Sequence, residues 1–145
     1  MEFIAGKING KYLSDIHKKA IQNCDAVKAA VAYAAKETLI IDDCIKANIP
    51  LIFWGRYDES QPVAIPILKR FIEARSPGIV CKLVPDIFHP KVIWWQGAGA
   101  YIGSANLTTK GWYDNIEAGI FLEDSELVEF DILRYLDDFF HILIV

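Results

Sequence analysis

Cysteines and long apolar runs are both scarce in this chain of 145 residues. Cys24, Cys44 and Cys81 form no Cys-x-x-Cys pair and no cluster with histidine at metal-ligand spacing, which argues against a zinc site or a disulfide framework. We therefore expect a reducing, cytoplasmic setting. No window approaches the roughly eighteen apolar residues that a membrane span needs. The beginning, MEFIAGKING, lacks the basic and apolar segments of a secretory signal.

Positive charge is also in short supply. The chain has 15 basic and 19 acidic residues and a formal net charge of −4. This balance excludes a protein that binds polyanions over its whole surface, so any phosphate site must be local. A hydrophobic fraction of 53% at this length favours one core, and we expect residues 1–145 to form a single catalytic domain. The apolar end, HILIV, leaves open that the domain is a fragment of a longer chain.

Strand and helix patterns alternate along the chain. This order is typical of an α/β fold, and we expect a mixed, largely parallel sheet with helices on both faces. Strands are expected over 26–34, 51–54, 79–84 and 115–123, with a hairpin over 88–95 and 100–106. Helices are expected over 13–20, 39–47, from near Pro66 to the Ser-Pro-Gly sequence at 76–78, and from Ser125 to Phe140.

The hairpin is where the polar side chains converge. His89 and Lys91 lie on one face of its first strand, because side chains alternate along a strand. With a two-residue type II′ turn at Gly97-Ala98, His89 lies opposite Asn106 and Lys91 opposite Ser104. Directly opposed side chains are about 5 Å apart at Cβ, so the four groups would share one patch. A three-residue loop would turn the two halves away from each other.

These residue types suit chemistry at phosphorus. An imidazole can attack phosphorus or donate a proton, and a neighbouring lysine can hold the negative oxygens of a phosphoryl group. Asn106 and Ser104 add donors, and Gly103 would let the backbone approach the ligand closely. Neither a metal ion nor another cofactor is needed if these groups carry the charge. A lone histidine is more often a packed residue than a catalyst, and we interpret His17 and His141 in that way.

The spacing resembles the signature of the phospholipase D superfamily, His-x-Lys-x4-Asp-x6-Gly-Ser-x-Asn. His89-Pro90-Lys91 is followed after four residues by Gln96, and Gly103-Ser104-Ala105-Asn106 begins six residues later. The resemblance implies a phospholipase D-like fold with His89 reacting at phosphorus, Lys91 and Asn106 holding the nonbridging oxygens, and Ser104 supporting them. Gln96 stands where the family usually has Asp. Strand parity puts it on the face away from His89.

The family also pairs its histidine with a downstream carboxylate. Glu117 in the sequence NIEAG is the candidate, with the role of orienting the imidazole, although it could instead be a solvated charge at the sheet edge. Asn115 shares its strand face. Gly103, Lys110 and Asn115 are the candidates for substrate binding.

One motif is half of what the superfamily uses, since one histidine attacks phosphorus while another protonates the leaving oxygen. The resemblance therefore implies a homodimer with a shared site on its twofold axis. Our leading hypothesis is a metal-independent endonuclease that cleaves DNA or RNA through a phosphohistidine, because GSANLTTKG and NIEAG resemble the nuclease branch. The alternatives are a noncatalytic dimerisation or nucleic-acid-binding module and a phospholipid phosphodiesterase. We expect no membrane association.

Overall fold

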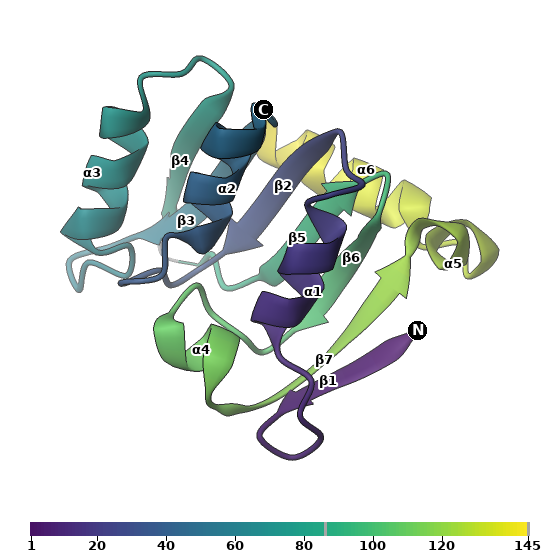
Figure 1. Ribbon diagram of the computed structural model, residues 1–145. Helices are drawn as coiled ribbons and strands as arrows, with labels where there is room; N and C mark the ends of the chain where they lie inside the picture. Colours follow the sequence, from purple (N-terminus) through teal and green to yellow (C-terminus); the bar gives the residue numbers. More distant parts are fainter. Residues whose placement is uncertain (86, 145) are drawn as a thin grey trace.

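Seven strands form one sheet in the computed structural model, which describes residues 1–85 and 87–144 (Figure 1). The elements in chain order are β1 (Glu2–Gly6), α1 (Leu13–Ala20), β2 (Ala26–Val31), α2 (Leu39–Ala47), β3 (Leu51–Tyr57), α3 (Ile65–Ala74), β4 (Ile79–Pro85), β5 (Lys91–Gln96), β6 (Gly99–Gly103), α4 (Thr109–Tyr113), β7 (Ile116–Glu123), α5 (Asp124–Glu129) and α6 (Leu133–Ile144). Their alternation confirms the predicted α/β class.

The sheet is mixed, with the strand order β1-β7-β6-β5-β2-β3-β4. Only β2, β3 and β4 run parallel to one another, and they are joined by the crossover helices α2 and α3. The other four pairings are antiparallel. The expectation of a largely parallel sheet was therefore wrong in that detail. Parallel pairing needs a long crossover, whereas the short β5–β6 connection allows only an antiparallel hairpin.

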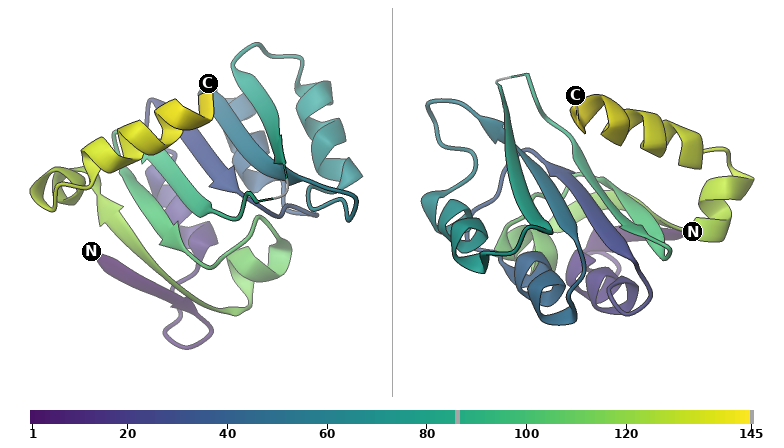
Figure 2. Two further views of the ribbon diagram at one scale, coloured as in Figure 1. Left: turned by 180° about the vertical axis from the view of Figure 1, so that it is seen from behind. Right: turned by 90° about the horizontal axis from the view of Figure 1, so that it is seen from above.

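Helices cover both faces of the sheet, as predicted. Figure 2 shows α1, α2 and α3 on one side and α5 and α6 on the other. Along β5, Ile93 and Trp95 enter the core under α1 to α3, while Trp94 enters the second core under α6. Trp94, Trp95 and Trp112 are all buried, so these aromatic rings stabilise the fold. Trp94 and Trp95 lie in β5 and pack on opposite faces of the sheet, whereas Trp112 lies in α4.

The helix ends follow local sequence signals. The helix α2 spans the predicted 39–47 and ends at Asn48, which takes the left-handed conformation with φ 56°. Pro66 lies in the first turn of α3, where its missing N–H costs no hydrogen bond. Among the described helices, none has the length and apolar character that crossing a membrane requires.

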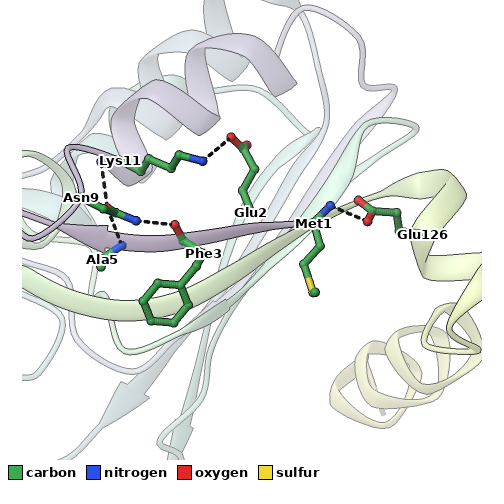
Figure 3. A network of polar contacts seen from close by, with 7 residues as sticks. All are labelled: Met1, Glu2, Phe3, Ala5, Asn9, Lys11 and Glu126. Carbon is green, nitrogen blue, oxygen red and sulfur yellow. Dashed lines mark hydrogen bonds and ion pairs between the residues drawn. The ribbon is translucent and has the colours of Figure 1, made fainter.

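The strand β1 was missed by the sequence analysis. It pairs antiparallel with β7, with Glu2 opposite Phe121 and Ile4 opposite Gly119. Figure 3 shows how Asn9 fixes the turn that follows: its carboxamide oxygen accepts from the backbone N–H of Ala5, and its amide nitrogen donates to the carbonyl of Phe3. The partner strand lies far away in the chain, so no local pattern reports the pairing.

The C-terminal segment forms two helices instead of the single helix expected from Ser125 to Phe140. Glu123 is the N-cap of α5, and a reciprocal capping box joins it to Glu126. The break between the helices contains Asp131, whose φ is 58°. A left-handed residue ends a helix, which explains why two helices form although the apolar periodicity is continuous and predicted one.

Candidate active site

Five strands have a terminus at the same end of the sheet, and we use 'this edge' for that end and not for an outermost strand. β2, β3 and β6 end there, whereas β5 and β7 begin there, because β5 and β7 run antiparallel to their neighbours. Backbone hydrogen bonds hold the flanking segments in line: the N–H of Arg56 donates to the carbonyl of Ala32, and the N–H of Ala32 donates to the carbonyl of Pro90. Side chains from distant parts of the sequence are therefore neighbours at this edge.

The register of the β5–β6 hairpin differs from the predicted one by one residue. Trp95 lies opposite Gly99, so three residues connect the two strands. The Ala98 N–H donates to the Trp95 carbonyl, and Gly97 has φ +99°, which is the geometry of a type II turn. The predicted pairs of His89 with Asn106 and of Lys91 with Ser104 were therefore wrong. The polar residues lie just beyond the paired strands.

His89 and Lys91 nevertheless lie together. His89 is exposed and precedes β5, and Lys91 is the first residue of that strand. The Lys91 Nζ is 3.2 Å from the His89 Nε2. Burial lowers the pKa of Lys91, and the negative charge of Glu117 partly opposes this effect. An imidazole and an ammonium group in contact, both at the surface, form the first half of the predicted constellation.

Ser104 and Glu117 form the second half. The Ser104 hydroxyl donates to the Glu117 carboxylate at 2.7 Å and accepts from the Ala118 N–H at 2.9 Å. The sequence predicted a bond from Glu117 to His89, but within the described part of the chain the side chain of Glu117 hydrogen-bonds to Ser104 only. Its charge acts on Lys91, which links the two halves.

Two other motif residues have surroundings that the sequence did not predict. The carboxamide oxygen of Asn106 is buried and finds no hydrogen-bond partner among the described residues. A Cβ on Gly103 would lie 2.4 Å from the hydroxyl of Tyr101 and 2.6 Å from the Cα of Gly119. Packing against Tyr101 and β7 thus already requires glycine at position 103, without any ligand.

The two remaining candidates lie at the surface beside this edge. Lys110 is exposed on α4, and Asn115 is exposed just before β7. The N–H of Asn115 donates to the Lys110 carbonyl at 2.7 Å, which closes the turn between the two elements. Their backbones are therefore held together while both side chains point to solvent.

The comparison that decides the family is a match over most of the chain. The family model described as the cardiolipin synthase phospholipase D-like domain matches residues 18–138. The chain belongs to the phospholipase D-like family. The matched range contains every candidate site residue from His89 to Glu117, which confirms the resemblance seen in the motif. This membership places the protein among phosphodiester hydrolases.

Solved structures share the phospholipase D-like fold. NucT from Helicobacter pylori has a TM-score of 0.64 at 16% identity, over 98% of this chain and 94% of that chain. The phospholipase D family member Nuc from Salmonella typhimurium has a TM-score of 0.65 at 17% identity, over 94% of this chain and 92% of that one. Polyphosphate kinase from Porphyromonas gingivalis has a TM-score of 0.59 at 12% identity, with 94% of this chain matching 22% of that chain. No curated protein sequence matches significantly.

Gln96 is where this chain departs from the phospholipase D-like signature. It ends β5 and pairs with Ala26, at the edge of the sheet opposite to His89. The two positions are seven apart in sequence along an extended segment, which corresponds to about 23 Å. The glutamine is therefore remote from the half-site.

His17 is a structural residue, as predicted. It is fully buried, its Nδ1 accepts from the indole N–H of Trp95 at 3.1 Å, and its Nε2 lies 2.9 Å from the Asp43 carboxylate. Since Nδ1 accepts, the ring proton is on Nε2 and donates to Asp43. Burial lowers the pKa of His17, although Asp43 opposes the effect. The imidazole is thus held neutral inside the core.

Sequence reasoning missed the residues on the other side of His89. The Tyr33 ring meets the His89 ring edge-on, with their centroids 6.0 Å apart. The guanidinium carbon of Arg56 is 5.9 Å from the centroid of Tyr33. Neither Tyr33 nor Arg56 belongs to the linear motif. The sequence could have pointed to them only through their place near the ends of β2 and β3.

Proposed function

We propose that this protein is a metal-independent phosphodiesterase, and specifically a homodimeric endonuclease whose site combines two copies of the half-site at His89. The observation that carries the proposal is the contact of His89 with Lys91 at the sheet edge, beside the linked pair of Ser104 and Glu117. These residues supply a nucleophile, a cation and hydrogen-bond donors, but only one reactive imidazole.

In the proposed reaction, Nε2 of one His89 forms a bond to phosphorus as the bond from phosphorus to the leaving oxygen breaks. The His89 of the second copy gives its proton to that oxygen. The second imidazole then takes a proton from water, the water oxygen bonds to phosphorus, and the bond from nitrogen to phosphorus breaks. Lys91 holds the nonbridging oxygens throughout, and the amide of Asn106 adds donors. Ser104, whose proton goes to Glu117, supports the site by fixing that carboxylate.

Glu117 has two possible actions in this scheme, of which the geometry supports the one through Lys91. Its charge favours the ammonium form of Lys91, and its bond to Ser104 fixes the segment after β6. The orienting action on His89 that the family resemblance implies would need a rotation of the Glu117 side chain.

A second copy of the chain is the partner that would complete the site. The chain has three histidines, of which His17 is fully buried in the core. Two large apolar side chains close in sequence to the half-site residues are exposed: Ile87, two residues before His89, at 94%, and Ile116, next to Glu117, at 65%. Apolar residues next to an incomplete polar site suit a self-complementary interface.

Nucleic acid is the substrate that we favour. The support is the resemblance of GSANLTTKG and NIEAG to the nuclease branch, with Lys110 and Asn115 exposed beside the half-site. The net charge of −4 predicts that binding relies on a few local contacts. A phospholipid substrate is the second candidate, because the matching family model is described as cardiolipin synthase.

The test measures cleavage and mass together. Plasmid, single-stranded DNA and phospholipid vesicles are each incubated with the protein in EDTA, beside His89→Ala and Lys91→Ala. We expect DNA cleavage by the parent protein, loss of cleavage in both variants, and a dimeric mass for all three proteins. Turnover of the vesicles alone would favour the lipid candidate. A monomer that cleaves DNA would contradict the shared site.

A further inference from the structure

A second polar group adjoins the half-site on the side away from Ser104. The Tyr33 ring contacts His89, and the Arg56 guanidinium lies over the edge of that tyrosine and donates from Nη1 to its hydroxyl at 3.4 Å. The two separations of 6.0 and 5.9 Å place the Arg56 guanidinium within about 12 Å of the His89 ring. The motif at His89 does not include either residue.

Arg56 is held in place by the turn that follows β3. Its Nε donates to the Asp58 carboxylate at 2.8 Å. The other oxygen of Asp58 accepts from both the backbone N–H and the hydroxyl of Ser60. These bonds fix Asp58 and, through it, the plane of the guanidinium, whose side chain keeps 23% of its surface exposed. The fork of Arg56 is therefore preorganised, with N–H groups left for a ligand.

A hollow of about 750 Å³ opens beside Arg56 at the ends of β3 and β4. Its lining is Arg56, Tyr57, Asp58, Glu59, Ser60 and Pro85. Tyr57 is 64% exposed, so its ring is available to contact a flat group in the hollow. Nε of Arg56 donates to Asp58 and Nη1 donates to Tyr33, so the N–H groups of Nη2 and the second N–H of Nη1 have no partner among the described residues.

We propose that Arg56, positioned by Asp58 and Tyr33, binds a phosphate of the substrate strand that flanks the cleaved one at a distance of a few nucleotides. The inference rests on the proposed nuclease function and names how that site holds its strand. A guanidinium matches the oxygens of a phosphate in a forked geometry. Successive phosphates of one strand advance by about 3.4 Å along the helix axis, so the distance from His89 fits a flanking phosphate within a few nucleotides. The nucleoside attached to it would lie in the hollow against Tyr57.

The test separates strand binding from chemistry. A fluorescent single-stranded oligonucleotide is titrated with His89→Ala protein in EDTA at several salt concentrations, with and without Arg56→Gln. We expect Arg56→Gln to weaken binding on the order of tenfold, because it removes charge-assisted hydrogen bonds. The slope of log affinity against log salt should fall by about 0.7, the value for one phosphate contact on a single strand.

Arg134 provides a matched control. It also pairs with an aspartate, Asp131, and lies over a tyrosine, Tyr135, but it is in α6. Arg134→Gln should change neither the affinity nor the slope. Equal values for the two variants would overturn the inference, as would weaker binding by Arg56→Gln at an unchanged slope, which would indicate a contact to a base.

A small ester completes the design. With His89 intact, hydrolysis of bis(p-nitrophenyl) phosphate should be unaffected by Arg56→Gln, since this ester has no flanking phosphate. An equal loss on the ester would overturn the inference in favour of a role in the reaction. If Arg56→Gln does not fold, Tyr33→Phe releases the same guanidinium and should give a smaller loss of affinity. A parent protein that hydrolyses neither DNA nor bis(p-nitrophenyl) phosphate would refute the proposed function. The binding titration would still show whether Arg56 contacts a phosphate.

Discussion

The Nζ of Lys91 lies 3.2 Å from the Nε2 of His89. An ammonium group only donates, so Nε2 accepts and the proton of the neutral ring is on Nδ1. This is the tautomer whose Nε2 lone pair can attack phosphorus, after Lys91 has turned its N–H groups from Nε2 to the phosphoryl oxygens. Lys91 therefore both selects the reactive form of the proposed nucleophile and stands next to the place where phosphoryl oxygens would bind.

The first prediction concerns the alkaline limit of activity. Burial lowers the pKa of Lys91 from 10.5, so this lysine loses its proton at a lower pH than a free lysine does. Activity that needs the ammonium form should fall at a correspondingly lower pH. Lys91→Arg keeps its charge to higher pH and should move the alkaline limb upward, at a reduced maximal rate. Initial rates are measured on bis(p-nitrophenyl) phosphate, because its p-nitrophenolate leaves without a proton from the His89 of the second copy. If the alkaline limbs of the parent and of Lys91→Arg coincide, they belong to a group other than residue 91.

The second prediction concerns Glu117. Its negative charge raises the pKa of Lys91 against the effect of burial. Glu117→Gln removes that charge while keeping the size of the side chain, so the alkaline limb should move to lower pH. Glu129→Gln, an exposed change at the end of α5, is the control and should leave the limb in place. An unchanged limb in Glu117→Gln would show that this carboxylate does not act through Lys91.

The third prediction concerns Gln96. Restoring the family's usual residue with Gln96→Asp should change activity by less than about twofold, because about 23 Å of extended chain separates this position from His89. The carbonyl of Gln96 accepts from the N–H of Asp25, so the new carboxylate would stand near another acid. A slightly lower melting temperature is expected. A large gain in rate would mean that the opposite edge of the sheet contributes to the reaction.

The fourth prediction concerns acid stability. Burial lowers the pKa of His17 below 6.5, so the unfolded chain binds the proton more readily than the folded one. The free energy of unfolding should therefore decrease as the pH falls below 6.5. His17→Gln should lower the melting temperature at neutral pH but reduce its further decrease in acid. Thermal melts of both proteins at neutral pH and at a pH below 6.5 test this. Equal decreases in melting temperature for the two proteins would exclude His17 as the cause.

The fifth prediction concerns Gly103, which the sequence suggested as a contact to substrate. Gly103→Ala should destabilise the fold by about 1–3 kcal/mol, because its Cβ would overlap the Tyr101 hydroxyl and the backbone of β7. Gly78→Ala is the control, since the nearest atom to its Cβ would be 3.7 Å away. Urea denaturation of the two variants makes the comparison. An unaltered urea midpoint for Gly103→Ala would show that packing does not require glycine here and would favour a contact with substrate instead.

Local patterns predicted the parts of the fold that depend on local forces. For α2, the helical spacing of the apolar residues predicted a helix over 39–47, and the structure has the same bounds. The family followed from the spacing between His89 and Asn106, which is a property of the sequence alone. The two-sided burial of the tryptophans in β5 followed from strand alternation.

Long-range relationships were not predictable in the same way. Gly97 can take part in either of two turns. In the observed turn Gln96 and Gly97 are the central residues, and the Gly97 N–H donates to the carboxylate of Asp124, which lies 27 residues later in the chain. The pairing of β1 with β7 likewise has no local signal. Arg56 and Tyr33 reach the site through sheet order, which a linear motif does not contain.

The strand order also has a consequence for biosynthesis. The reactive edge lies between β2, which is made early, and β7, which is made late and supplies Glu117. A nascent chain therefore carries His89 and Lys91 before the residues that complete their surroundings have left the ribosome. The half-site therefore cannot assemble until β7 has paired with β6 and brought Glu117 close to Lys91.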